Sequence, residues 1–204
     1  METEEAAGNR RPLKSRTTRW ASLVARAALA AGLTANQVSF LGIVIAAVGS
    51  WALIESPGQP WLFLCAALCI QLRLLANMID GLVAVEGGRG GPTGAIWNEF
   101  PDRVEDSLFL VAAGYAAALP WLGWLTALLA AICAYVRLLG GTLGLPQDFG
   151  GPMAKPHRMA ALTIGCLVAI AWPHAIAVAL VAIAAGTVVT IARRLARQSK
   201  ALRS

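Results

Sequence analysis

Long apolar stretches separated by short turns dominate this chain from about residue 34 onward. Glycine- and proline-rich segments near 57–60, 87–94, 120, 140–156 and 173 predict turns or loops. About 20 apolar residues in a helix cross the hydrocarbon core of a bilayer. The pattern therefore predicts an all-α integral membrane protein with six transmembrane helices, at residues 34–54, 61–81, 95–119, 120–139, 157–172 and 174–192.

Polar and basic residues precede and follow this apolar region. In residues 17–31, apolar positions alternate with Arg19 and Arg26, which is typical of a short amphipathic helix on the membrane surface. We expect three parts: a polar basic tail at 1–16, a surface helix at 17–31, and a six-helix transmembrane domain with a basic C-terminal tail at 32–204.

Hydrophobic residues make up 57% of the 204 residues and charged residues only 14%, which also favours a membrane protein. The formal net charge of +6 is unevenly distributed. Three predicted turns contain no Lys or Arg, whereas the chain ends and the loops near 85–103 and 137–158 do. Basic residues are enriched in cytoplasmic loops. Both termini should therefore be cytoplasmic, in the inner (plasma) membrane of a bacterium. End clusters of this kind suit anionic lipid headgroups, so no nucleic-acid partner is expected.

The four cysteines all lie within apolar stretches: Cys65, Cys69, Cys133 and Cys166. Cys65 and Cys69 are one helical turn apart, a spacing that metal sites also use. No histidine or second cysteine pair accompanies them, so we interpret all four as small core residues.

Acidic residues are concentrated between residues 77 and 106, which hold six of the chain's eleven. A carboxylate at membrane depth is costly and by default has a function. Helical spacings of three and four place polar side chains on one face of each helix. These side chains are Asn77 and Asp80 on the second predicted span, and Asn98, Glu99, Asp102 and Asp106 on the third. Because the connection is short, we expect the two helices to be neighbours.

Carboxylate and amide oxygens without His or Cys make a hard metal site, suited to Mg²⁺, Mn²⁺ or Ca²⁺ rather than zinc. In phosphoryl chemistry such metals neutralise phosphate oxygens while a further carboxylate accepts a proton. Three cations on the same predicted side suit phosphate groups: Arg137, Lys155 and Arg158.

The acidic segment resembles the signature of the CDP-alcohol phosphotransferase (phosphatidyltransferase) family. That signature reads D-x-x-D-G-x-x-A-R, eight residues, then G-x-x-x-D-x-x-x-D. The spacing is kept throughout, with matches at Asp80, Gly81, Ala84, Gly94 and Asp102. Asn77 and Asn98 stand at two of the four Asp positions, and Val85 stands at the Arg position. Six spans after a surface helix also agree with the family's plan.

The resemblance implies transfer of a phosphatidyl-type group from a CDP-linked lipid, such as CDP-diacylglycerol, to an alcohol, with release of CMP. It implies two divalent ions, Mg²⁺ or Mn²⁺, and the last motif acid, Asp102, as the base. The expected metal ligands are Asn77, Asp80, Asn98 and Asp102, supplemented by Glu99 and Asp106. The expected substrate-binding residues are Gly81, Ala84, Gly94, Arg137, Lys155 and Arg158. The resemblance also suggests a homodimer.

The departures from the signature affect charge. Two carboxylates supply half of the charge that four would give to two divalent ions, so one ion site is expected to be weak unless Glu86, Glu99 or Asp106 compensates. Arg89 or Arg103 is expected to replace the cation missing at Val85.

Two alternatives are kept. The neutral motif positions suit a catalytically silent family member that binds lipid or nucleotide, and Arg73 among the acids suits a small ion-coupled transporter. The acceptor is expected to be a small alcohol or an alcohol phosphate, and the basic cluster favours the phosphorylated class.

Overall fold

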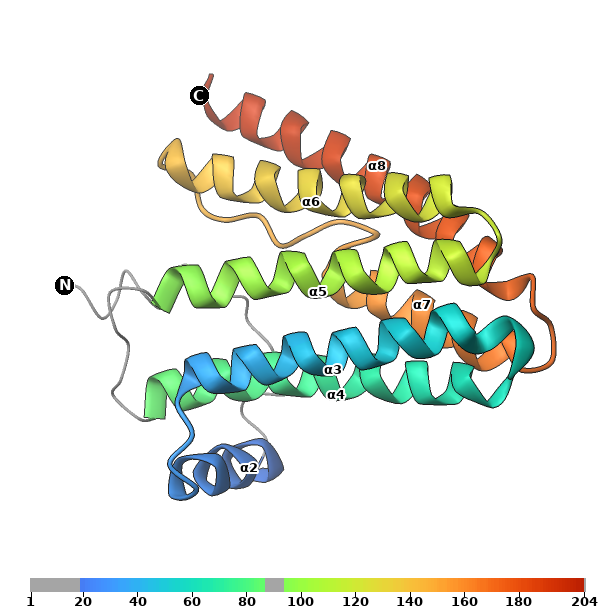
Figure 1. The fold of residues 1–204 in the computed structure, drawn as a ribbon. Coiled ribbons are helices and arrows are strands. Elements are labelled where there is room, and N and C mark those ends of the chain that lie inside the picture. The colour runs from blue at the N-terminus through green and yellow to red at the C-terminus, as the bar shows by residue number, and fades with distance from the viewer. Residues whose placement is uncertain (1–18, 87–93, 204) are drawn as a thin grey trace.

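The computed structural model describes residues 19–86 and 94–203, and every regular element in those two ranges is a helix (Figure 1). The predicted tail at 1–16 and most of the loop at 87–94 lie outside the described residues. The helices are α2 (Arg19–Ala30), α3 (Ala35–Glu55), the 3₁₀ turn η2 (Ser56–Gly58), α4 (Trp61–Glu86), α5 (Gly94–Ala116), α6 (Pro120–Thr142), α7 (Lys155–Ala169) and α8 (Ala175–Ala201).

The helical, membrane-embedded character predicted from the apolar pattern is confirmed. Within the described residues, four helical segments are long and apolar enough to cross a bilayer: Ala35–Gly58, Trp61–Val83, Pro120–Thr142 and Ala175–Ala201. The helices α5 and α7 do not meet these criteria of length and apolarity. The first half of α5 is rich in charged residues, and α7 has only 15 residues.

The short helix α2 lies across the end of the bundle where α4 ends and α5 begins (Figure 1). It contacts α4, while Leu23 and Val24 remain exposed. A capping box then starts α3: the Thr34 hydroxyl accepts a hydrogen bond from the Gln37 amide, and the Gln37 side chain accepts one from the Thr34 amide. This cap ends the surface segment and starts the first long helix at a defined residue.

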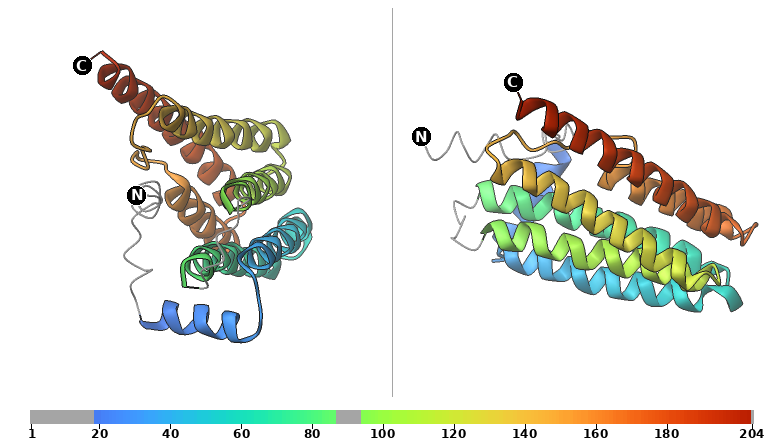
Figure 2. Two further views of the ribbon diagram at one scale, coloured as in Figure 1. Left: turned by 90° about the vertical axis from the view of Figure 1, so that its left-hand side faces the viewer. Right: turned by 90° about the horizontal axis from the view of Figure 1, so that it is seen from above.

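The six long helices form a ring, which Figure 2 shows nearly end-on. Going around it, α3 packs against α4, α4 against α7, α7 against α8, α8 against α6, α6 against α5, and α5 against α3. The α4–α5 contact across the ring is small by comparison. The prediction that these two helices are neighbours therefore holds only over a short length, because α3 packs against both.

Apolar side chains fill most of the ring, including the fully buried Leu53, Ile70, Phe109 and Leu180. The helices α5 and α6 approach most closely at Gly114 and Gly123. A Cβ on Gly114 would lie 2.6 Å from the Gly123 Cα, so only glycine permits this backbone contact. The four cysteines are free thiols, and two of them are fully buried.

The connection at 143–154 turns back alongside α6, so that α7 begins partway down the bundle (Figure 1). Side chains of α8 hold it there. The Arg194 guanidinium donates to the Gly150 carbonyl at 3.0 Å, and the Met153 amide donates to the Thr190 hydroxyl at 2.9 Å. This path brings Lys155 and Arg158, at the start of α7, to the depth of the acids on α5.

Candidate active site

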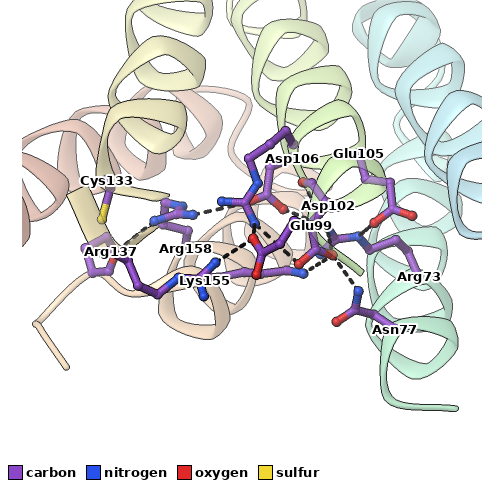
Figure 3. A network of polar contacts seen from close by, with 12 residues as sticks. Arg73, Asn77, Glu99, Asp102, Glu105, Asp106, Cys133, Arg137, Lys155 and Arg158 are labelled. Carbon is purple, nitrogen blue, oxygen red and sulfur yellow. Dashed lines mark hydrogen bonds and ion pairs between the residues drawn. The ribbon is translucent and has the colours of Figure 1, made fainter. Parts of the chain in front are cut away.

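Charged side chains from four helices meet inside the ring at one end (Figure 3). The spacing of three and four places the acids of α5 on a face directed toward α4 and α7. Arg73 and Asn77 come from α4, Arg137 from α6, and Lys155 and Arg158 from α7. The acids on α5 are Glu99, Asp102, Glu105 and Asp106. Residues far apart in sequence thus form one polar cluster.

Arg73 lies at the centre of the cluster and has an exposed fraction of 0%. Its Nε donates to Glu105, and its Nη2 donates to Asp106 Oδ1 at 2.9 Å. The same Nη2 lies 3.3 Å from both the backbone oxygen and the Oδ1 of Asp102. A guanidinium offers five N–H donors in a fixed plane, which suits it to holding several carboxylates at once. Arg73 thereby bridges the space between α4 and α5.

A glycine makes room for this arrangement on α3. A Cβ on Gly42 would overlap the Glu105 carboxylate. Glycine at position 42 therefore lets the buried Glu105 fit between α3 and Arg73.

Asp106 joins the same cluster to α7. Its second carboxylate oxygen accepts a hydrogen bond from the Arg158 guanidinium at 3.0 Å, and Arg158 also donates to the Met153 carbonyl at 3.1 Å. Both side chains are almost fully buried. Buried charges are stable only when they are paired and hydrogen-bonded, and this pair meets both conditions.

Asp102 receives more donors than any other acid described in the cluster. Lys155 forms an ion pair with its Oδ1, and the Asn77 amide donates to the same oxygen at 2.5 Å. Arg103 lies 3.4 Å from Oδ2. These donors fix the position of the Asp102 carboxylate, and a carboxylate held in this way suits a general base.

Asp80 is different, because no described cation pairs with it. Its Oδ2 accepts a hydrogen bond from the Ser39 hydroxyl on α3 at 2.8 Å. Its Oδ1 is buried without a hydrogen-bond partner. Asp102 and Lys155 are close enough to act on it electrostatically. An unpartnered buried carboxylate oxygen beside a second carboxylate is a position that suits a cation.

Glu99 and Arg137 form the outer edge of the cluster. Arg137 Nη2 lies 2.5 Å from Glu99, and its other terminal nitrogen donates to Gln147. The guanidinium also stacks over the Phe149 ring at 5.1 Å from the ring centre. Arg137 is thus held by the connection at 143–154 and aimed at α5.

The structure brings most of the predicted site residues together. They are Asn77, Asp80, Glu99, Asp102, Asp106, Arg137, Lys155 and Arg158. Gly81 is half-buried one residue beyond Asp80, and Gly94 begins α5 with open space around it. Ala84 and Asn98 lie on α4 and α5, but their side chains are outside the described part of the structure.

Three residues of the cluster were not predicted as site residues. Arg73 was noted only for the transport alternative, and Glu105 and Ser39 were not singled out. The sequence spacing could have identified Arg73 and Glu105. Arg73 precedes Asn77 by one helical turn and Glu105 follows Asp102 by three residues, so both continue the polar faces.

The donor set fits one divalent cation better than two. Among the described residues, no three His, Cys, Asp or Glu side chains come together as a metal-binding group. Four carboxylates are already paired with Arg or Lys. Asp80 offers a free oxygen, with Asp102 and the Asn77 amide oxygen as further hard donors.

No protein-family model matches the chain. Curated relatives do. The phosphatidylinositol phosphate synthase of Mycolicibacterium smegmatis is 30% identical over 182 residues, which cover 84% of this chain and 80% of that protein.

Two solved structures of the Mycobacterium tuberculosis phosphatidylinositol phosphate synthase share the fold. One, in complex with manganese and citrate, has a TM-score of 0.76 at 24% identity and covers 87% of this chain and 88% of its own. The other, with CDP-DAG bound, has a TM-score of 0.76 at 23% identity and covers 89% and 94%.

The ring of apolar helices around a buried cluster of carboxylates and basic side chains defines an integral membrane protein with a polar site at one end of the bundle. The chain belongs to the CDP-alcohol phosphatidyltransferase family, and it is a transferase of phospholipid biosynthesis. The resemblance noted in the sequence is thereby confirmed.

Proposed function

We propose that this chain transfers a substituted phosphate group from a CDP-linked lipid, such as CDP-diacylglycerol, to an alcohol acceptor and releases CMP. One observation carries the proposal: the Asp102 carboxylate lies within a buried cluster of basic side chains contributed by α4, α5 and α7. The similarity to a structure with CDP-DAG bound supports the donor.

Asp102 is the proposed base. It accepts the hydroxyl proton of the acceptor while the acceptor oxygen bonds to the lipid-bearing phosphorus. The bond from this phosphorus to the bridging oxygen breaks, and CMP leaves with the electron pair. Arg73, Asn77 and Lys155 hold the Asp102 carboxylate in place before the reaction.

The basic side chains bind the phosphates in this proposal. Arg137, Lys155 and Arg158 face the interior of the cluster and suit phosphate oxygens. Gly81, Ala84 and Gly94 permit close approach of the nucleotide. Since Arg137 and Arg158 are held by the 143–154 connection, that connection sets the geometry of phosphate binding.

A divalent cation, Mg²⁺ or Mn²⁺, completes the proposed site. The related structure in complex with manganese supports this assignment. Asp80, Asp102 and Asn77 are the described residues that would hold it; Asn98, Glu99 and Asp106 were also predicted as ligands, and a second, weaker ion was predicted with them. When bound, the cation neutralises donor phosphate oxygens and stabilises the leaving group.

The proposed acceptor is a small alcohol phosphate rather than a neutral alcohol. Three basic side chains at one site exceed what a neutral hydroxyl compound requires. The curated relative is named a phosphatidylinositol phosphate synthase, which supports the phosphorylated class.

The proposed topology has six spans, with α5 and α7 as the two polar or short ones. The surface helix, both termini and the site would lie at the cytoplasmic face of a bacterial inner membrane. The basic terminal segments support this orientation. A homodimer is part of the proposal on family resemblance alone.

CMP release tests the proposal directly. Detergent-purified full chain is incubated with CDP-diacylglycerol, Mg²⁺ or Mn²⁺, and a panel of alcohols and alcohol phosphates. Wild type should release CMP with a phosphorylated acceptor, and Asp102→Asn should lower the rate about 10²- to 10⁴-fold by removing the base.

Glu55→Gln is the control. It likewise converts a carboxylate to an amide, at an exposed position at the end of α3, and should leave CMP release near the wild-type rate. No CMP release with any acceptor would favour the silent-member alternative. Ion flux into proteoliposomes without CMP release would favour the transporter.

A further inference from the structure

We propose that this chain holds one divalent cation, at Asp80, and that the ammonium group of Lys155 takes the place of a second ion on Asp102. The inference rests on the proposed function but concerns only how many ions bind and where. The observations that carry it are the donors around Asp102, the charges of the cluster and the unpartnered oxygen of Asp80.

The Oδ1 of Asp102 is already surrounded by nitrogen donors. Lys155 forms an ion pair with it, the Asn77 amide donates to it at 2.5 Å, and Arg73 Nη2 lies 3.3 Å away. A carboxylate oxygen has about two lone-pair positions. Oδ1 therefore has no acceptor capacity left for a metal unless a donor is displaced. Oδ2, which Arg103 approaches at 3.4 Å, is the oxygen that Asp102 can contribute to the cation at Asp80, so no oxygen of Asp102 remains for a second ion.

The charges of the described cluster cancel before any metal binds. Five cations take part in its ion pairs: Arg73, Arg103, Arg137, Lys155 and Arg158. The acids paired with them are Glu99, Asp102, Glu105 and Asp106, and the unpaired Asp80 makes the number of acids equal to the number of cations. Each divalent ion then adds two positive charges that only the phosphates of the donor can offset, so the cluster accommodates one ion more readily than two.

Asp80 is the position where a cation is missing. It is 5% exposed, and its Oδ2 accepts the Ser39 hydroxyl. Its Oδ1 is buried and has no hydrogen-bond partner. A buried carboxylate oxygen left unpaired is costly, so this oxygen points to a bound cation rather than to a structural role.

Asn77 also distinguishes this site from one with four carboxylates. With Asp at this position, two carboxylates would face each other at the Asn77–Asp102 contact and would need a cation between them. With Asn, the amide nitrogen donates directly to Asp102. Asn77 and Lys155 therefore act jointly in place of a second ion. Asn77 removes the negative charge of the signature Asp, and Lys155 supplies a positive charge to Asp102.

Manganese binding tests this inference without reference to turnover. Equilibrium dialysis of the full chain in detergent, with CDP-diacylglycerol present, gives the number of bound Mn²⁺ ions, and electron paramagnetic resonance shows whether they are magnetically coupled. Wild type should bind one ion with an uncoupled spectrum. Asp80→Asn should lose it, whereas the control Glu55→Gln, at the exposed end of α3, should keep it.

A variant designed to bind a second ion tests the inference more sharply than the loss of one ion. The variant Asn77→Asp/Asn98→Asp/Lys155→Met restores the acids and removes the ammonium group, and it should bind two ions with a coupled spectrum. If this variant does not fold, Asn77→Asp/Lys155→Met tests the same exchange with α5 unchanged.

Two ions or none in wild type, or a folded gain variant that still binds one, would overturn the inference. CMP release by the same preparations separates it from the proposed function. One bound ion without CMP release contradicts only the transfer reaction, and two bound ions with CMP release contradict only the ion count.

Discussion

The helices α5 and α8 both bury polar side chains inside the bundle, but the partners of those side chains differ in kind. On α8, Arg194 donates to the Gly150 and Cys133 carbonyls at 3.0 and 2.9 Å, and Gln198 donates to the Val136 carbonyl at 2.8 Å. On α5, the buried acids pair with side-chain cations from other helices.

This difference indicates that the polar side chains of α8 stabilise the fold, whereas those of α5 can exchange their partners for a ligand. A backbone carbonyl is neutral and cannot move independently of the chain, so the hydrogen bonds of α8 stabilise the positions of α6 and the 143–154 connection. A lysine or arginine paired with a carboxylate can turn instead to a phosphate of similar charge and geometry. The cluster on α5 can therefore open to a ligand, while α8 keeps its surroundings in place.

Arg73→Met should have the largest effect on stability. It leaves Glu105 buried without its cation and removes one of the partners of Asp106, and breaking a buried pair in this way costs about 3–5 kcal/mol. The measurement is unfolding of the purified protein in detergent. Arg73→Met/Glu105→Gln should recover part of the loss, because the unpaired carboxylate is removed.

A contrary result would change the interpretation of α5. If Arg73→Met unfolds at the wild-type midpoint, the acids of α5 do not depend on Arg73, and the bridge between α4 and α5 is not a stabilising element.

Arg194→Met should have an effect of intermediate size, on stability rather than on the transfer reaction. The buried Cys133 carbonyl and the part-buried Gly150 carbonyl lose their donor, which costs about 1–3 kcal/mol. The exposed neighbour Arg193 offers a control of the same chemistry, and Arg193→Met should leave stability near wild type. A loss of CMP release in folded Arg194→Met without any loss of stability would contradict the separation of the two regions.

Gly42→Ala should have the smallest effect. The new methyl group would overlap the Glu105 carboxylate, and a shift of that flexible side chain costs about 1 kcal/mol in stability. Gly58→Ala is the matched control, because a Cβ there meets nothing within 4 Å. Equal unfolding midpoints for the two variants would show that Glu105 does not pack against α3 as described.

The sequence predicted the parts of this molecule that depend on local periodicity. The apolar pattern located the long helices, and spacings of three and four placed Asp102 and Asp106 on one face. Four of the helices meet the length and apolarity needed for a span. The third predicted span contains Pro101, and α5 runs continuously from Gly94 through this proline.

What the sequence did not predict depends on packing between distant segments. The direct contact between α4 and α5 is small because α3 packs against both, and the Arg73 side chain spans the remaining space to Glu105 and Asp106. The approach of Lys155 to Asp102 depends on the path of the 143–154 connection alongside α6. Neither path follows from the spacing of residues within one helix.

The transfer reaction is tested most directly by following the phosphorus atom. CDP-diacylglycerol labelled with ³²P at the lipid-bearing phosphate is incubated with purified protein, Mn²⁺ and an alcohol phosphate. The label should appear in a new lipid product while unlabelled CMP is released, and Asp102→Asn should slow both about 10²- to 10⁴-fold. Label that stays with the nucleotide, or that appears only in phosphatidic acid, would contradict transfer to an alcohol.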